Sequence, residues 1–374
     1  MLTREFAAPP VGGAELQQTL LAKALSRRGW RVSMVVADHG QPDGAAWDGI
    51  RTFRAYRPDA GIPLVRFIHP RWTGLHSAMA RADAQVYYTS CAGAHLAQVV
   101  LFARPRGRKV AFRIASNSDC NPRELLVQYW RDRLLYGYGL ARADLVLAQT
   151  AHQQRALGEN FRRASAIAPA LIERGGRCRD FDGRDIDALW VGNIRAVKRP
   201  ELLLQAARSL PQIRFHMVGG PMPGAERLFE ATRREAAGLP NVTFHGAVPY
   251  HDVRALYERA RILVSTSAVE GFPNAYLQAW DRGAPVVGFL DPDGLLGRFC
   301  MGRAVRDMKE MDAAIATLSR DRPQWEQASA RAREYMEQRC DEEKALAPYL
   351  AALSALCVAG AGVRCAVEAP VARG

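Results

Sequence analysis

Lysine, long apolar runs and paired cysteines are all scarce in this sequence of 374 residues. Five of its 51 basic residues are lysine, and the remainder are arginine. No stretch of 18 residues is continuously apolar, and the first ten residues lack the apolar segment of a secretory signal. We therefore expect no membrane-spanning helix and a cytoplasmic location. The seven cysteines form no Cys-x-x-Cys pair, so neither a disulfide framework nor a structural zinc site is predicted.

Positive charge is concentrated in the first half of the chain. Residues 1–170 contain 23 basic and 12 acidic side chains, whereas residues 171–374 contain 28 and 26, within a total net charge of +13. A basic surface favours anionic partners such as phosphates, anionic lipid or nucleic acid, although a solvated arginine-rich face is the alternative. No helix-turn-helix or alternation of basic and aromatic residues is present, so nucleic acid is not an expected partner.

Apolar strands alternate with helical patterns along the whole chain. Leucines at helical spacing predict a helix over 14–28, and a strand follows at 32–37. Further strands are predicted at 86–89, 110–114 and 145–148. A Gly- and Arg-rich stretch, 174–184, reads as a linker. The second half repeats the rhythm with strands at 188–192, 215–219, 242–246, 262–266 and 285–289, helices at 200–210, 226–237, 252–260 and 275–281, and helix from 307 to about 355.

Repeated strand–helix units predict a parallel sheet with helices on both faces. Two such halves imply an α/β protein with two doubly wound, Rossmann-like domains facing a cleft, followed by C-terminal helices. The predicted ranges are 1–170 and 171–345, with the end of the terminal helix and a disordered tail in 346–374. Ligands of such sheets bind beyond the carboxyl ends of the strands.

The strongest local motif is STSAVEGFPNAYLQAWDRGAPVV at 265–287. A strand ends in small hydroxyl residues, a loop carries Glu270, Gly271 and Pro273, and a helix begins with Asn274 as its expected N-cap. The free N–H groups at a helix start suit an anionic phosphate. Glu270 can accept hydrogen bonds from sugar hydroxyls. A capped surface loop is the alternative reading of the same residues.

With VGNIRAVKRPELLLQA (191–206) and PVGGAELQQTLLAKALSRRGWRV (10–32), this motif resembles the retaining glycosyltransferases of family 4, in order, over roughly residues 10–345. The resemblance implies the GT-B fold and a nucleotide-sugar donor held mainly by the second domain. In the family a second Glu follows the first after seven residues, and this chain has Gln278 at that place. The loss of charge implies weaker donor binding or a different nucleotide preference.

The resemblance assigns site residues position by position. Glu270 would face the donor sugar, and Gly271 and Phe272 would offer backbone N–H groups. The family's Gly-Arg is Gly192-Asn193 here, so Arg195 and Lys198 are the expected pair that neutralises the diphosphate. The donor-binding set is completed by Gly219, Gly220, Ala247 and Val248 near the base, and by Pro273, Asn274 and Gln278.

Three further segments carry weaker predictions. Gly12 and Gly13, with Glu15 after them, are expected to line the acceptor side and approach the phosphates, although Glu15 can instead cap the helix. The loop at 115–119 lacks the family's His, and Asp119 either orients an acceptor hydroxyl or starts a helix near Pro122. The DPDG at 291–294 reads as a tight turn rather than a metal-binding Asp-x-Asp.

These observations predict a retaining glycosyltransferase that moves a sugar to a hydroxyl of a glycan or lipid-linked glycan, with no cofactor or metal. The basic first half predicts peripheral contact with anionic membrane. Gln278 and Asn193 keep open a catalytically impaired GT-B protein that binds a glycan or partner, and a nucleotide-sugar epimerase shares the fold. Only eight residues precede Pro9, so we expect an apolar first strand to be encoded upstream of Met1.

Overall fold

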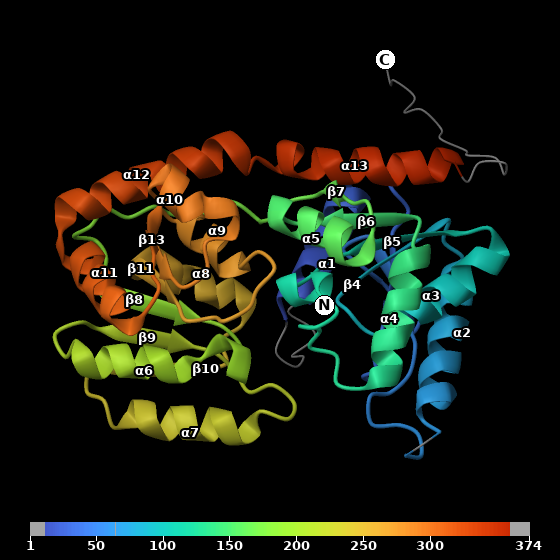
Figure 1. Cartoon of the computed structure of the whole chain (residues 1–374), viewed down its shortest axis with the longest axis horizontal. Coiled ribbons are helices and arrows are strands. Elements are labelled where there is room, and N and C mark those ends of the chain that lie inside the picture. The colour runs from blue at the N-terminus through green and yellow to red at the C-terminus, as the bar shows by residue number, and fades with distance from the viewer. Residues whose placement is uncertain (1–11, 64, 360–374) are drawn as a thin grey trace.

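The structure, a computed structural model, describes residues 12–63 and 65–359 of the chain. It forms two α/β halves, the first on the right of Figure 1 and the second on the left, with the long last helices running along one side of both. The expected first strand and the tail beyond residue 359 lie outside the described residues. The α/β class and the alternation of strands with helices are as predicted.

The first half contains two sheets among the described residues. Strands β4, β5, β6 and β7 are parallel and lie in that order, whereas β1 pairs in parallel with β3, which pairs antiparallel with β2. Its elements are α1 Gly13–Arg27, β1 Ser33–Val36, β2 Ala46–Trp47, β3 Ile50–Arg54, α2 Thr73–Ala82, β4 Val86–Ser90, α3 Ala94–Ala103, β5 Lys109–Arg113, α4 Trp130–Arg142, β6 Leu145–Ala148, α5 Ala151–Phe161 and β7 Ala166–Ile167.

The second half is one parallel sheet of six strands in the order β10-β9-β8-β11-β12-β13. The order reverses between β8 and β11, which is the point where doubly wound sheets bind ligands. Its elements are β8 Ile186–Val191, α6 Pro200–Ser209, β9 Phe215–Val218, α7 Glu226–Ala237, β10 Val242–Gly246, α8 Tyr250–Arg259, β11 Ala260–Ser265, α9 Asn274–Asp281, β12 Val286–Gly288, α10 Leu295–Phe299, β13 Gly302–Ala304, α11 Met308–Arg320 and α12 Arg322–Arg339.

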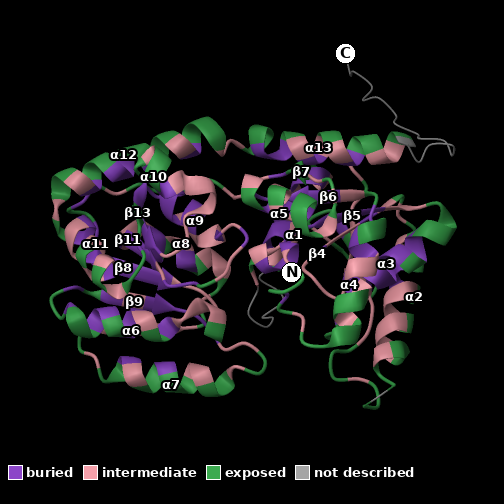
Figure 2. Cartoon of the chain, in the orientation of Figure 1, coloured by how far each residue is buried: buried purple, intermediate pink, exposed green. Residues whose placement is uncertain are grey.

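Burial on both faces explains why the central strands of the second half, β8, β11 and β12, are mostly apolar. Trp190 and Met217 pack on one face of the second sheet with α6 and α11, and Leu189 and Leu263 pack on the other with α9 and α12. In Figure 2 the strands of the second half are mostly purple, which marks burial, and the helices around them carry exposed residues in green. A one-residue slip of any strand would exchange its two buried faces, so the register is strongly specified.

The last helix, α13 (Glu342–Ala359), crosses back to the first half. Its buried residues Leu346, Tyr349 and Leu353 pack against leucines of α1 such as Leu20. They share this core with Ala111 of β5 and Leu147 of β6. The Tyr349 hydroxyl donates to the carbonyl oxygen of Pro169 at 2.8 Å. The chain thus passes between the halves twice, in the linker after β7 and at the α12–α13 junction. Of the predicted domain limits, the one at 170/171 falls in this linker and the one at 345/346 falls within α13.

Among the described residues, we find no helix with both the length and the apolar character needed to cross a membrane.

Candidate functional site

Hydrogen bonds join the loops that follow β8 and β11, where the strand order of the six-stranded sheet reverses. The Trp190 indole donates to the Thr266 hydroxyl at 2.9 Å, and that hydroxyl donates to the Lys198 carbonyl oxygen at 2.6 Å. Arg199 donates to the Thr266 carbonyl oxygen at 2.7 Å, and the Ala268 N–H donates to the Val197 carbonyl oxygen at 2.8 Å. These bonds fix the two loops that carry the predicted phosphate and sugar residues.

Lys198 and Glu270 form an ion pair across these two loops, and both side chains are more than four-fifths buried. In the part of the chain that the structure describes, the exposed Arg195 makes no hydrogen bond or ion pair through its side chain. An ammonium group has three N–H donors, so Lys198 can keep Glu270 and still bind an anion. The site therefore combines one engaged cation and one available cation beside a carboxylate.

The first half closes over the Glu270 loop. The Asn117 N–H donates to the Glu270 carbonyl oxygen at 2.9 Å. At Gly271, an added Cβ would collide with the Ala115 carbonyl oxygen and the Gln149 side chain. Gly271 is thus required by the close approach of two backbones from different halves of the chain.

The prediction that Asn274 is the N-cap residue of α9 is wrong. The N-cap position of α9 is Pro273, and no side chain caps this helix. Asn274 is the first helical residue, and its amide donates to the Gly13 carbonyl oxygen at 3.0 Å while accepting from Gln17 at 3.0 Å. The local pattern predicted a cap because it could not show that α1 lies against this helix start.

The predicted glycine loop is therefore brought to the site, with Gly12 as the N-cap residue of α1 and Gly13 against Asn274. Glu15 is exposed in the first turn, with its carboxylate beside Gly12. Gln17, which the sequence analysis does not single out, is buried and also exchanges two hydrogen bonds with the Leu171 backbone at 2.7 and 2.8 Å. No sequence signal marks it, since its partners are 154 and 257 residues away.

The Asp119 carboxylate is used within its own loop. It accepts from the N–H groups of Ala115 at 3.0 Å and Ser116 at 3.1 Å, closing a capping box on the 3-10 turn Asn117–Cys120. Burial raises the pKa of this carboxyl group, and the backbone N–H donors oppose that rise. This geometry favours a role for Asp119 in starting a helical turn over one in orienting an acceptor hydroxyl. The turn is the 3-10 turn at 117–120, however, and the next helix of the described chain, α4, starts at Trp130 and not near Pro122.

The residues predicted near the nucleotide base meet at the carboxyl edge of β8, β9 and β10. The Gly219 N–H donates to the Gly246 carbonyl oxygen at 2.8 Å, and Ile194 donates to the Gly220 carbonyl oxygen at 2.9 Å. An added Cβ on Gly219 would strike the Gly192 carbonyl oxygen, and one on Gly220 would lie 2.9 Å from the Ala247 side chain. Val248 follows Ala247, and Asn193 follows Gly192 in the loop after β8.

Gln278 lies one turn into α9, beside a small cavity that it shares with Glu173, Tyr250 and Arg254. Glu173 and Arg254 form an ion pair at 2.9 Å there. Phe272 packs edge-on to Trp280, with ring centres 6.4 Å apart. The Phe272 side chain is therefore held by the core of the second half.

The 291–294 segment is a turn, as predicted, but it has a further role. The two Asp293 carboxylate oxygens accept from the N–H groups of Ala151 at 2.8 Å and His152 at 3.1 Å, at the start of α5. The second half thus caps a helix of the first half, which stabilises the closed arrangement.

Residues 185–321 match the family described as Glycosyl transferases group 1. A stretch of 137 residues is 31% identical to a D-inositol 3-phosphate glycosyltransferase of Mycobacterium sp. (strain KMS), covering 34% of this chain and 31% of that protein. The chain thus matches about a third of the length of this curated relative.

Two solved structures extend the likeness over nearly the whole chain. Sucrose-phosphate synthase from Thermosynechococcus elongatus superposes with a TM-score of 0.74 at 18% identity, over 94% of this chain and 96% of that one. Anabaena HepE, solved in complex with UDP-glucose, gives 0.69 at 15% identity, over 93% and 97%. Over residues 185–321 the chain therefore resembles the group 1 glycosyltransferases. Its two halves form the predicted GT-B fold.

Gly271→Ala is expected to destabilise the closed arrangement, because its Cβ would overlap the Ala115 backbone. Overpacking of this kind costs about 1–3 kcal/mol in the free energy of unfolding. Gly137→Ala, inside α4 with open space around it, is the matched control and should instead stabilise by about 0.5–1 kcal/mol. Urea unfolding of both variants measures the difference. Equal effects of the two substitutions would contradict the close contact.

Proposed function

We propose that this chain transfers a sugar, with retention of configuration, from a nucleotide-diphosphate sugar to a hydroxyl of a glycan or lipid-linked glycan. The observation that carries the proposal is the Lys198–Glu270 pair, held at the reversal point of the second sheet and closed over by the first half. Support also comes from related structures, since HepE was solved with UDP-glucose and Staphylococcus aureus TarM with UDP and α-GlcNAc-glycerol.

The diphosphate would lie between the two loops. Lys198 and Arg195 would neutralise the negative charge that grows on the leaving diphosphate, which is an electrostatic form of transition-state stabilisation. The start of α9, where no side chain caps the helix, would add backbone N–H donors. Residues 219–220 and 247–248 would contact the base.

The sugar would lie against Glu270. Its carboxylate can accept hydrogen bonds from sugar hydroxyls, and Gly271 and Phe272 can donate backbone N–H groups. In the transfer step, the bond from the sugar's anomeric carbon to the diphosphate oxygen breaks and a bond to the acceptor oxygen forms on the same face. The acceptor proton passes to the leaving phosphate oxygen. No protein nucleophile or metal ion is required for this balance.

We also propose that the first half contacts anionic membrane from the cytoplasmic side through an apolar patch of two segments. Each of its seven side chains is between 52% and 74% exposed. Arg131 joins the segments, because its guanidinium lies 3.7 Å from the ring centre of Phe67. The start of α4 and the segment before α2 lie together at the lower right of Figures 1 and 2. The patch consists of Ile62, Val65, Ile68, Leu126, Tyr129, Trp130 and Leu134.

Charge near the patch suits a lipid surface with negative headgroups. Residues 61–72 contain two arginines and no acid, and residues 121–134 contain three arginines and two acids. Exposed aromatic and aliphatic side chains with arginine around them are typical of interfacial binding. The second segment begins just after the 117–120 turn, whose Asn117 contacts Glu270. A lipid-linked acceptor would then be presented beside the cleft.

Lys198→Ala and Arg195→Ala should each weaken binding of nucleoside diphosphate by roughly 10- to 150-fold, since a charge-assisted contact contributes about 1.5–3 kcal/mol. Calorimetric titration with UDP and GDP measures the loss. Lys309→Ala, an exposed lysine on α11, serves as the control and should bind as the wild type. Unchanged affinity in both loop variants would remove the phosphate role.

Glu270→Ala should reduce sugar transfer by at least about 100-fold while Gln278→Glu leaves donor binding intact or tighter, because only Glu270 faces the reacting sugar. Nucleoside diphosphate release in the presence of acceptor measures transfer, and calorimetry measures binding. Glu270→Gln removes the negative charge but keeps the size of the side chain, so it tests whether the charge itself is required. Turnover near the wild-type rate in Glu270→Ala would show that the sugar is positioned elsewhere.

The combined variant Trp130→Gln, Leu134→Gln should partition onto vesicles of anionic phospholipid about tenfold less than the wild type, because both changes remove exposed apolar area. Val358→Gln, which is 73% exposed on α13, controls for loss of any exposed apolar side chain. Co-sedimentation at two salt concentrations measures the effect. Equal partition onto neutral and anionic vesicles at both salts would exclude the electrostatic part of the proposal.

A further inference from the structure

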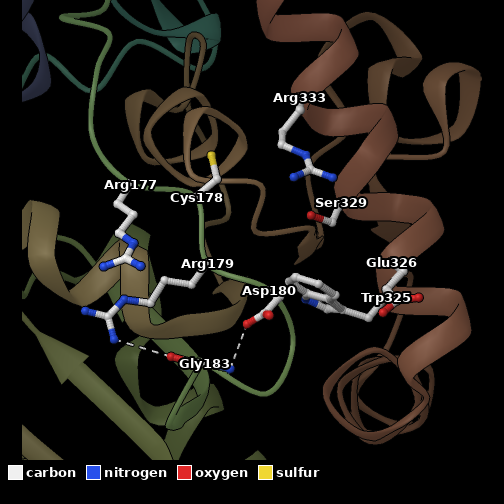
Figure 3. A pocket seen from close by; sticks show the side chains of 9 residues that line it. All are labelled: Arg177, Cys178, Arg179, Asp180, Gly183, Trp325, Glu326, Ser329 and Arg333. Carbon is white, nitrogen blue, oxygen red and sulfur yellow. Dashed lines mark hydrogen bonds between the residues drawn. The ribbon is translucent and has the colours of Figure 1, made fainter.

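A second concave surface lies away from the interdomain site. It is a cavity of about 710 Å³ between the linker that precedes β8 and helix α12. Because the linker enters β8 at its amino end, this cavity lies at the sheet edge opposite to the Lys198 and Glu270 loops. Figure 3 shows its lining residues, which are Arg177, Cys178, Arg179, Asp180 and Gly183 from the linker and Trp325, Glu326, Ser329 and Arg333 from α12.

Positive charge is in excess on the walls of this cavity. Within the described chain, Arg177 and Arg333 make no ion pair through their side chains. Arg179 donates to the Gly183 carbonyl oxygen at 3.3 Å, and its buried Nε has no partner. Of the two acids, Glu326 is already engaged by Arg322 at 2.7 Å, outside the cavity lining. Three guanidinium groups therefore face the cavity against one carboxylate, Asp180, that has no arginine partner among the described residues.

A fourth guanidinium lies directly behind the cavity. Arg184 is 1% exposed, and its side chain donates to the backbone carbonyl oxygens of Arg179, Tyr257, Ala260 and Arg282. No carboxylate of the described residues forms a salt bridge with it. Its guanidinium lies 4.9 Å from the ring centre of Trp325, which lines the cavity.

A buried charge with no counter-charge is costly in a medium of low dielectric constant. Burial lowers the pKa of Arg184 to about 10, and the charges of Arg333 and Arg179 act in the same direction. An anion in the cavity would face the guanidinium groups of Arg177, Arg179 and Arg333 and would reduce the repulsion that Arg179 and Arg333 exert on Arg184. A bound anion would therefore supply negative charge close to Arg184, which has no salt-bridge partner among the described residues.

We propose that this cavity binds a polyphosphate-bearing anion, with Arg177 and Arg179 on the linker wall and Arg333 on the α12 wall. Guanidinium groups match phosphate oxygens as bidentate donors, and several phosphates are needed to meet cations on both walls. The Ser329 hydroxyl offers a further polar contact. The linker and α12 both continue into chain crossings between the halves, so a bound anion would tie those two crossings together. This site does not depend on the proposed sugar transfer.

Cys178 lines the cavity and is exposed, so its alkylation reports occupancy directly. We would label the full-length protein with iodoacetamide, a neutral reagent, and follow Cys178 and Cys300 by peptide mass spectrometry. Cys300 is also exposed but does not line the cavity. Inorganic tripolyphosphate is expected to slow labelling of Cys178 alone. The protection should persist in Lys198→Ala, since that lysine belongs to the other site.

Arg177→Ala and Arg333→Ala should each raise the tripolyphosphate concentration for half-protection by at least tenfold. Arg331→Ala is the matched control on α12, because that arginine is paired with Glu334 at 2.9 Å and does not line the cavity. Citrate tests whether carboxylates suffice, and protection at least tenfold weaker than with tripolyphosphate is expected. Absence of protection at millimolar tripolyphosphate, equal protection of Cys300, or unchanged midpoints in both arginine variants would overturn the proposal, as would equal protection by citrate.

Discussion

Glu270 is held from both halves of the chain, and the rest of the site depends on that double attachment. Its carboxylate pairs with Lys198 of the second half, and its carbonyl oxygen accepts the N–H of Asn117 from the first. Gly271 follows immediately and leaves no room for a side chain between the two backbones. The Glu270 loop is therefore attached to both halves in the closed arrangement. The geometry of the candidate site and the closure of the two halves therefore share the same contacts.

Much of the second half could be predicted from the sequence because its signals are local. The helix over 226–237 and the strand over 242–246 agree with the structure to the residue. The helix carries apolar residues at helical spacing and the strand alternates apolar and polar residues, so each can be recognised from its own segment. The motif around Glu270 lies, as its pattern predicts, between the end of β11 and the start of α9, beside the reversal in strand order.

The first half was harder to predict for a physical reason. β3 was not among the predicted strands, since its residues Arg51 and Arg54 interrupt the apolar pattern. Asn274, Gln17 and Asp293 act through partners that are more than a hundred residues away. A capping rule uses only neighbouring residues, so it assigned Asn274 to its own helix. Polar side chains that join two domains have no local periodicity, and a structure is needed to find them.

The return of α13 has a consequence for the order in which the protein is made. The leucine-rich face of α1 and the neighbouring sheet residues are covered by Leu346, Tyr349 and Leu353, which leave the ribosome last among the residues of that core. At a synthesis rate of about 5–20 residues per second, the first half waits on the order of ten seconds for its own cover. During this interval the nascent first half exposes an apolar surface that only the end of the described chain can shield. Maturation of the first half is therefore tied to completion of the second, because its core includes residues of α13.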